Sequence, residues 1–164
     1  MANVRTGDKA PNFELKDLDG KRVSLQEALK RGPVVAAFFK VSCPVCQFTF
    51  PFLERLFKAY ASDRTTFWAL SQDDARDTRE FCAEYGVTFP ALVDDDGYPT
   101  SNDYGLTNVP TYYLIARDGT VQVDSVGFGK NALEKLSEAL ARFLGRPVAA
   151  VFNPGEVVPD SKPG

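Results

Sequence analysis

Two cysteines separated by two residues, Cys43 and Cys46, form the part of this sequence best suited to chemistry. Two thiols at this spacing can close into a disulfide and open again, which is a reversible two-electron reaction. An apolar run at 33–39 precedes the pair, and a stretch rich in phenylalanine and leucine follows it. The pattern predicts a buried strand that leads to the pair and a helix that begins at it.

The helix start predicts different roles for the two thiols. A thiol attacks a disulfide as its thiolate, and the unpaired N–H groups and positive dipole end of a helix N-terminus favour that anion. Cys43 falls at the expected N-cap and Cys46 lies one turn inside, so we expect Cys43 to be the nucleophile and Cys46 the resolving thiol. Pro44 suits the first helical position, and we expect Pro44 and Val45 to contact the substrate.

The same spacing also begins zinc ribbons, so half of a zinc site is the alternative interpretation. The sequence has no histidine and its third cysteine is Cys82, so a zinc ion would have to borrow a carboxylate. The acidic turn at 94–97 lacks the spacing and closing Glu of a calcium loop, so we expect a solvated turn there. We therefore favour thiol chemistry, predict no metal site, and expect Cys82 to be a buried, unreactive thiol on a helix.

The tripeptide Val109-Pro110-Thr111 is the second candidate feature. A proline just before a strand is ordinarily an edge or turn residue, and this interpretation stays open for the tripeptide taken alone. Beside a cysteine pair it suggests more, because a cis Val109–Pro110 bond would free backbone N–H and C=O groups to pair with an extended peptide. We predict that Val109, Pro110 and Thr111 bind the substrate next to the sulfurs.

The elements that must position these residues follow from the remaining patterns. The continuous apolar run at 33–39 is typical of a strand buried on both faces, as in parallel sheets. Apolar residues at three- and four-residue spacing predict a helix from 44 to about 61. An Asp-Gly pair at 19–20 predicts a hairpin turn near the N-terminus. We expect further strands at 13–15, 22–23, 66–70, 89–93, 111–116 and 120–126, and further helices at 24–30, 74–85 and 131–144.

Length and composition exclude several classes of protein. The 164 residues are 44% hydrophobic and 12% aromatic, which suits one globular domain. A net charge of -3 argues against a nucleic-acid-binding surface, because such surfaces gather Lys and Arg. No apolar run is long enough to span a membrane, and the first residues carry no signal-peptide core. We expect a monomeric cytoplasmic protein, or an exported one if a signal sequence was removed.

A change of composition separates two parts of the chain. Residues 1–145 contain all the strand and helix patterns, and we expect them to form the domain. Residues 146–164 are polar and rich in proline and glycine. We expect this C-terminal tail to lie on the surface or to be partly disordered.

The expected order along the chain is a strand, the motif at 43–46, a helix containing Pro51, and then Val109-Pro110-Thr111 before a hairpin and a last helix. This order resembles that of the thioredoxin superfamily. More narrowly, the chain resembles the TlpA-like, AhpC/TSA-related redoxins. The stretches that carry this narrower resemblance are 10–15, 19–21, 84–90 and 113–119. The likeness covers about residues 5–144.

The resemblance implies an α/β fold, a three-layer α/β/α sandwich with a mixed central sheet and an N-terminal β-hairpin extension. It implies a thiol-disulfide oxidoreductase in which Cys43 attacks, Cys46 resolves and Pro110 is the cis-proline facing them. Such a protein needs no cofactor beyond the redox-active disulfide between the two cysteines. Its partners are proteins with a disulfide or dithiol, or a reductase.

Three positions depart from the family pattern. The Trp usual before the first cysteine is Ser42, the buried Asp of many thioredoxins is Ala37, and the Glu of many TlpA-like proteins is Thr49. Proton transfer at Cys46 must therefore use water, an unassigned carboxylate, or Lys40. A Lys at a strand end is ordinarily only solvated, and we favour that interpretation of Lys40.

Two other functions are possible on the same fold. Peroxiredoxins of this branch reduce hydroperoxides with a cysteine in a Pro-x-x-x-Thr-x-x-Cys setting. Counting back from Cys43, the Thr and Pro positions hold Lys40 and Ala36, and counting back from Cys46 they hold Cys43 and Phe39. A redox-silent module that only binds peptides is the other alternative, but the intact cysteine pair argues against it.

Overall fold

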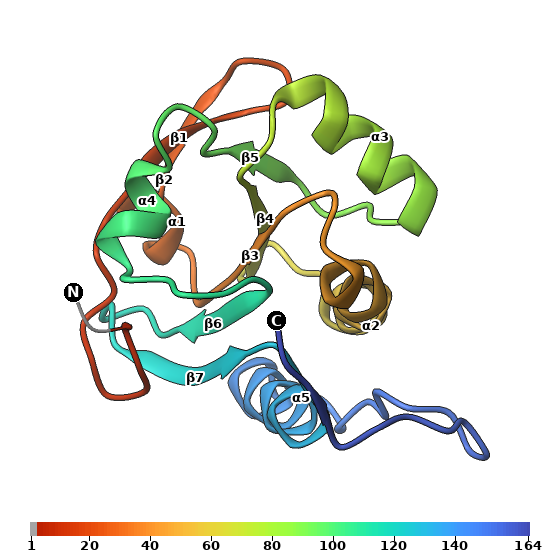
Figure 1. The fold of residues 1–164 in the computed structure, drawn as a ribbon. Helices are drawn as coiled ribbons and strands as arrows, with labels where there is room; N and C mark the ends of the chain where they lie inside the picture. Colours follow the sequence, from red (N-terminus) through yellow and green to blue (C-terminus); the bar gives the residue numbers. More distant parts are fainter. Residues whose placement is uncertain (1–2) are drawn as a thin grey trace.

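The computed structural model describes residues 3–164 of the chain. In it, the strand before the cysteine pair, β3 (Val34–Phe39), lies inside a seven-stranded sheet (Figure 1). It runs parallel to β4 (Thr66–Ser71) on one side and antiparallel to β6 (Thr111–Ile115) on the other. All of its side chains are buried. Burial on both faces explains why its sequence is a continuous apolar run rather than an alternating one.

The sheet has the order β2-β1-β5-β4-β3-β6-β7. β5 (Ala91–Val93) is parallel to β4, whereas β7 (Val121–Val126) forms an antiparallel hairpin with β6. β1 (Glu14–Asp17) pairs antiparallel with β5, and β2 (Arg22–Ser24) pairs with β1. The predicted mixed sheet with an N-terminal hairpin extension is confirmed.

The segment before β1 lies along the opposite edge of the same sheet. The Gly7 N–H donates to the Val121 carbonyl at 2.9 Å, and the Val121 N–H donates to the Asp8 carbonyl at 2.9 Å. The Thr6 hydroxyl donates to the Asp124 carboxylate at 2.6 Å. The N-terminal part of the chain therefore pairs with β7 at one side of the sheet and with β5 at the other.

Helices cover both faces of the sheet (Figure 1). One face packs against α2 (Pro44–Tyr60), α3 (Ala75–Tyr85) and α5 (Lys130–Leu144). The other face packs against α1 (Leu25–Leu29) and α4 (Pro99–Asp103). The three-layer α/β/α arrangement that the resemblance implied is confirmed. Within residues 3–164, no helix has both the length and the apolar character needed to cross a membrane.

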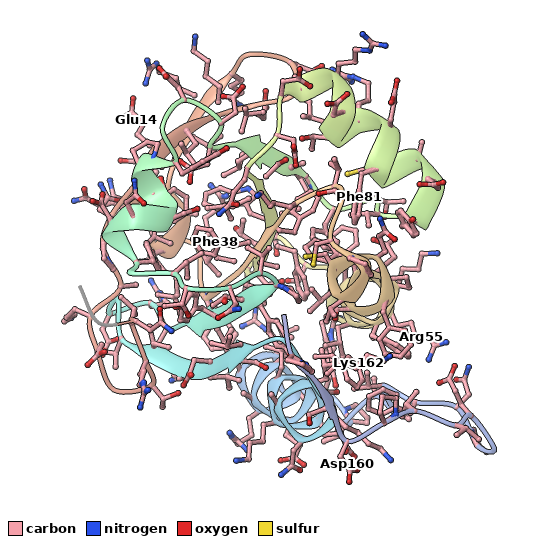
Figure 2. All side chains as sticks on the ribbon, viewed as in Figure 1. Glu14, Phe38, Arg55, Phe81, Asp160 and Lys162 are labelled. Carbon is pink, nitrogen blue, oxygen red and sulfur yellow. The ribbon has the colours of Figure 1, made fainter. Side chains whose placement is uncertain are left out.

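Each face of β3 belongs to its own aromatic core, and Phe38 and Phe81 mark the two cores in Figure 2. On the α2 side, the Phe39 ring centroid lies 4.6 Å from that of Phe50 and 4.6 Å from that of Phe81. On the α1 side, the Phe38 ring lies 5.2 Å from the ring of Tyr104. Because β3 is held by aromatic rings on both faces, its C-terminal end, where the cysteine pair follows, is firmly placed.

The tail, residues 146–164, folds back along α2 and α5, and it reaches the loop before β6 (Figure 1). The Arg55 guanidinium on α2 donates two hydrogen bonds to the Glu156 carboxylate, at 2.7 and 2.8 Å. Further along, β9 (Ser161–Lys162) pairs antiparallel with β8 (Phe128–Gly129). The sequence patterns did not predict these two short strands.

The segment between β5 and Tyr104 contains the short helix α4, which the sequence patterns also missed. Its N-cap, Tyr98, has φ 54° and no side-chain capping bond. The helix is held instead by Asp94, whose carboxylate accepts from the Thr100 N–H at 3.0 Å and from the Ser101 N–H at 2.9 Å. The prediction of a solvated turn at this point was wrong for Asp94, which is buried.

Helix α3 offers a direct test of its capping residue. The Asp74 carboxylate accepts a hydrogen bond from the Asp77 N–H at 2.8 Å. Replacing Asp74 by Ala leaves that N–H unpaired, so we expect the free energy of unfolding to fall by about 1 kcal/mol. Urea unfolding measures this difference. The control is Asp96→Ala in an exposed turn, which should change the free energy by less than about 0.5 kcal/mol.

Candidate active site

Helix α2 begins at the cysteine pair, where the sequence predicted a helix start. Cys43 is the N-cap residue in an extended conformation, and its Sγ accepts a hydrogen bond from the Cys46 N–H at 3.1 Å. Pro44 takes the first helical position and is exposed, and Val45 is half-buried. All three cysteines, including Cys82, are free thiols in the structure. The first turn of the helix thus directs an N–H group at the Cys43 sulfur.

The loop between β3 and α2 is held by hydrogen bonds on both sides. The Cys43 N–H donates to the Lys40 carbonyl at 3.2 Å. The Val41 N–H donates to the Asp73 carboxylate at 2.8 Å, and the Val41 carbonyl accepts from the Gln47 side chain at 2.9 Å. The Lys40 residue is exposed. The position of Cys43 therefore depends on the backbone of Lys40 and on the side chains of Asp73 and Gln47.

The loop before β6 lies against the first cysteine. The Val109–Pro110 peptide bond is cis. The Cys43 thiol donates to the Val109 carbonyl, with 3.5 Å between sulfur and oxygen. Pro110 is buried, and Thr111 begins β6 with its hydroxyl donating to the Asn108 carbonyl at 2.7 Å. Because β6 pairs with β3, the two loops meet at the same end of the sheet.

The two thiols of the pair differ in exposure. Cys43 is half-buried, whereas Cys46 has no exposed surface. Burial raises the pKa of the Cys46 thiol far above its usual range, and its hydrogen bond to Cys43 and the negative charge of Asp73 raise it further. Cys46 therefore keeps its proton at neutral pH, while the Cys43 sulfur is the one that a partner can reach.

Asp73 is a residue of this site that the sequence patterns did not single out. Both Asp73 and Asp74 could have capped α3, and neither residue type nor spacing distinguishes them. In the structure Asp74 is the cap, whereas the Asp73 carboxylate holds the Val41 N–H and raises the pKa of Cys46. Only the folding of β4 beside β3 brings this carboxylate to the cysteine loop.

Metal ligands do not gather near the pair. Within residues 3–164, no group of three or more His, Cys, Asp or Glu residues could hold a metal ion. Cys82, the remaining cysteine, is half-buried on α3, and burial raises its pKa to about 11, with a further contribution from the charge of Glu54. Glu54 is itself buried and accepts the Thr88 N–H at 2.8 Å.

Comparison with known proteins identifies the family. The AhpC/TSA family model matches residues 6–124, which include the cysteine pair and the cis-proline loop. The chain belongs to the AhpC/TSA family.

Proteins similar to this AhpC/TSA-family chain include several that are named for thiol-disulfide chemistry. It is 34% identical over 128 residues to the thioredoxin-like protein YneN of Bacillus subtilis, covering 76% of this chain and 73% of that protein. It is 30% identical over 142 residues to the thiol-disulfide oxidoreductase ResA of Bacillus thuringiensis, covering 86% and 78%. A solved structure assigned as thiol:disulfide interchange protein DsbE, from Chlorobium tepidum, superposes with a TM-score of 0.75 at 29% identity, covering 87% and 100%.

The structure shows the environment of the three residues that depart from the family pattern. Ser42 is exposed, so no aromatic side chain covers the pair from that position. Ala37 is buried in β3, and the Thr49 hydroxyl donates to the Val45 carbonyl at 2.7 Å within α2. Since neither position carries an acid, Asp73 is the carboxylate whose charge acts on Cys46 in this family member.

Proposed function

We propose that this protein is a thiol-disulfide oxidoreductase in which Cys43 and Cys46 exchange electrons with protein disulfides or dithiols. The names of the relatives at 30% identity and above support this class of enzyme. The contacts of Cys43 support its role, because one sulfur accepts the Cys46 N–H and also touches the Val109 carbonyl. That double contact is the observation that carries the proposal.

The first step is attack by the Cys43 thiolate on one sulfur of a substrate disulfide. A bond forms between Cys43 and that sulfur, the substrate S–S bond breaks, and the second substrate sulfur leaves as a thiolate. The N–H groups at the start of α2 favour the negative charge on the attacking sulfur. The product is a mixed disulfide between Cys43 and the substrate.

The second step is attack by Cys46 on the Cys43 sulfur of the mixed disulfide. Cys46 loses its proton to the departing substrate thiolate or to water, a Cys43–Cys46 disulfide forms, and the substrate leaves as a dithiol. Two electrons have moved from the protein to the substrate. A dithiol protein or a reductase restores the thiols by the reverse exchange, and we propose that no other cofactor takes part. The raised pKa of buried Cys46 keeps it protonated until the first step is complete.

The substrate contacts follow from the surroundings of Cys43. We propose that an extended substrate segment pairs with the backbone of Val109 and lies against Pro110 and Thr111, in a short form of strand addition. The Pro110 carbonyl already accepts the Gly127 N–H at 2.7 Å, and Thr111 is paired within the sheet. Pro44 is exposed beside the sulfur, and Val45 is half-buried behind it. We also propose that the protein acts as a monomer.

One experiment separates this function from a peroxidase. With dithiothreitol present as the final reductant, the protein is mixed with insulin, whose disulfides are accessible, and separately with hydrogen peroxide; insulin precipitation and peroxide loss are followed. We expect turnover of insulin disulfides that depends on both cysteines, and only slow oxidation by peroxide. Rapid peroxide turnover that persists in Cys46→Ser would instead support the peroxidase alternative.

Alkylation provides a second, independent prediction. With limiting iodoacetamide at pH 7, Cys43 should be modified first, because Cys46 is buried and Cys82 has a pKa of about 11. At that pKa roughly one Cys82 in ten thousand is a thiolate at pH 7, so its rate should rise tenfold for each pH unit up to about 11. Peptide mass spectrometry of samples taken over time measures all three rates. Modification of Cys82 before Cys43 would contradict the assignment.

A further inference from the structure

The last described part of the chain forms an extended strand beside the active site. In the β8–β9 pair, Phe128 lies opposite Lys162 and Gly129 opposite Ser161. Gly127, with φ 78°, allows this close approach, because any side chain there would collide with the Lys162 carbonyl. Residues 161–162 are thus held as a short strand added to β8.

The same segment reaches the cis-proline loop. The Asn108 side-chain amide donates to the Gly164 carbonyl at 3.2 Å. Gly164 lies so close to Val109 that a side chain at position 164 would collide with the Val109 carbonyl. This carbonyl is the group that accepts the Cys43 thiol. The tail therefore packs on the backbone that we propose as the substrate edge.

A side-chain contact on α2 completes the docking of this segment. The Lys162 ammonium lies 5.0 Å from the centre of the Phe48 ring, a cation–π contact. Phe48 follows Cys46 by two residues and is half-buried. Figure 2 shows Lys162 beneath α2 and Asp160 at the outer side of the tail. The segment thus lies on the flank of α2 as well as on the cis-proline loop.

The tail is anchored firmly at one end and lightly at the other. Near its start, the Tyr60 hydroxyl accepts the Ala149 N–H at 2.7 Å, Val151 is buried, and Arg55 pairs with Glu156. The residues at 159–164 are exposed, and they are held by the two-residue pairing with β8, by the Lys130 N–H that donates to the Asp160 carbonyl at 2.9 Å, and by the contacts with Asn108 and Phe48. Residues 159–164 can therefore detach from β8 and the cis-proline loop while the contacts of 149–156 keep them close to the site.

We propose that residues 160–164 occupy the peptide-binding edge beside Cys43 and compete there with protein substrates. The inference rests on the proposed function, because it concerns access to the same site. A protein disulfide needs the Val109 backbone edge to dock, so the tail must move aside first. A small disulfide needs only the Cys43 sulfur, and the tail does not impede it.

Deletion of residues 160–164 tests this competition. If the tail leaves the Val109 edge free in only a minor fraction of molecules, deleting the tail segment should raise the apparent affinity for a protein substrate by the inverse of that fraction. We expect kcat/KM for insulin reduction to rise about fivefold, and kcat/KM for hydroxyethyl disulfide to stay within about 1.5-fold. Circular dichroism and thermal unfolding check that the shortened chain is folded.

Substitutions in the complete chain provide a second test. Gly164→Leu should displace the segment by collision with Val109, and it should reproduce the deletion. Val157→Leu is the matched control, because Val157 is 96% exposed on the same tail, and it should change neither substrate. In Cys46→Ser with a trapped insulin chain, the Lys130 amide, which donates to the Asp160 carbonyl at 2.9 Å, should exchange with deuterium faster than in the free protein.

The outcomes distinguish this inference from the function on which it rests. An unchanged or lower rate of insulin reduction in both tail variants would overturn the proposed competition. An equal rise for insulin and hydroxyethyl disulfide would also overturn it, because the tail would then only shield the Cys43 sulfur. If no variant reduces either disulfide, the proposed function fails instead. Deuterium exchange of the free protein, which needs no activity, would overturn the docked position if the Lys130 amide, which donates to the Asp160 carbonyl at 2.9 Å, were unprotected.

Discussion

Replacing Cys43 by Ser should lower the rate of insulin reduction by at least about a thousand-fold, because a serine hydroxyl cannot form the mixed disulfide with the substrate. The fold should be unaffected, since the hydroxyl can accept the Cys46 N–H as N-cap in place of the sulfur. The turbidity of reduced insulin measures the rate. A variant that retained a tenth of the activity would contradict the assignment of Cys43.

The same reasoning gives Cys46→Ser a different outcome. The first step remains possible, but the mixed disulfide cannot resolve, so the variant should accumulate covalently bound to its substrate through Cys43. Non-reducing gel electrophoresis and mass spectrometry detect this species. Cys82→Ser is the control, because Cys82 lies on α3 outside the pair, and it should retain at least about half of the activity.

Replacing Phe39 by Ala should have the largest effect on stability. Phe39 has no exposed surface, and its ring contacts those of Phe50 and Phe81, so truncation leaves a cavity between β3, α2 and α3. We expect the free energy of unfolding to fall by about 3–5 kcal/mol. Urea unfolding followed by far-ultraviolet circular dichroism measures the change.

Phe143→Ala is the matched control for this cavity. Phe143 belongs to α5, but its side chain is 39% exposed. The same truncation there should lower the free energy of unfolding by about 1 kcal/mol or less. Equal effects at the two positions would contradict the central place of Phe39 in the core.

The order of the main elements could be predicted because the signals are local. The apolar run of β3, the helical spacing of α2 and the Asp19-Gly20 turn each lie within a few residues. The structure has β3 at Val34–Phe39 and α2 at Pro44–Tyr60, and the Asp17 carbonyl accepts the Gly20 N–H at 3.1 Å in the hairpin turn. Local patterns sufficed for these elements.

Elements that depend on distant partners were not predicted. β8 and β9 are only two residues each, and they exist because the tail returns to Phe128, which no local pattern indicates. Helix α4 has an N-cap without a capping side chain, and the buried carboxylate of Asp94 replaces that signal. Both cases rest on tertiary contacts that override weak local propensity.

The candidate site divides in the same way. Residue type and spacing pointed to Cys43 and Cys46, and the adjacent prolines pointed to the loops on which they lie. The contact of Cys43 with Val109 and the influence of Asp73 on Cys46 depend on β6 and β4 lying on either side of β3. Sheet order, rather than sequence distance, brings these groups together.

The pairing of the N-terminal segment with both sides of the sheet has a consequence for synthesis on the ribosome. The Thr6 hydroxyl reaches Asp124 across 118 positions of sequence, and β1 pairs with β5, which is made much later. These N-terminal segments must therefore wait until β5 and β7 have been made before they find their partners. Until they pair, β5 and β7 keep open backbone edges, and the growing chain depends on these late contacts to avoid pairing with other chains.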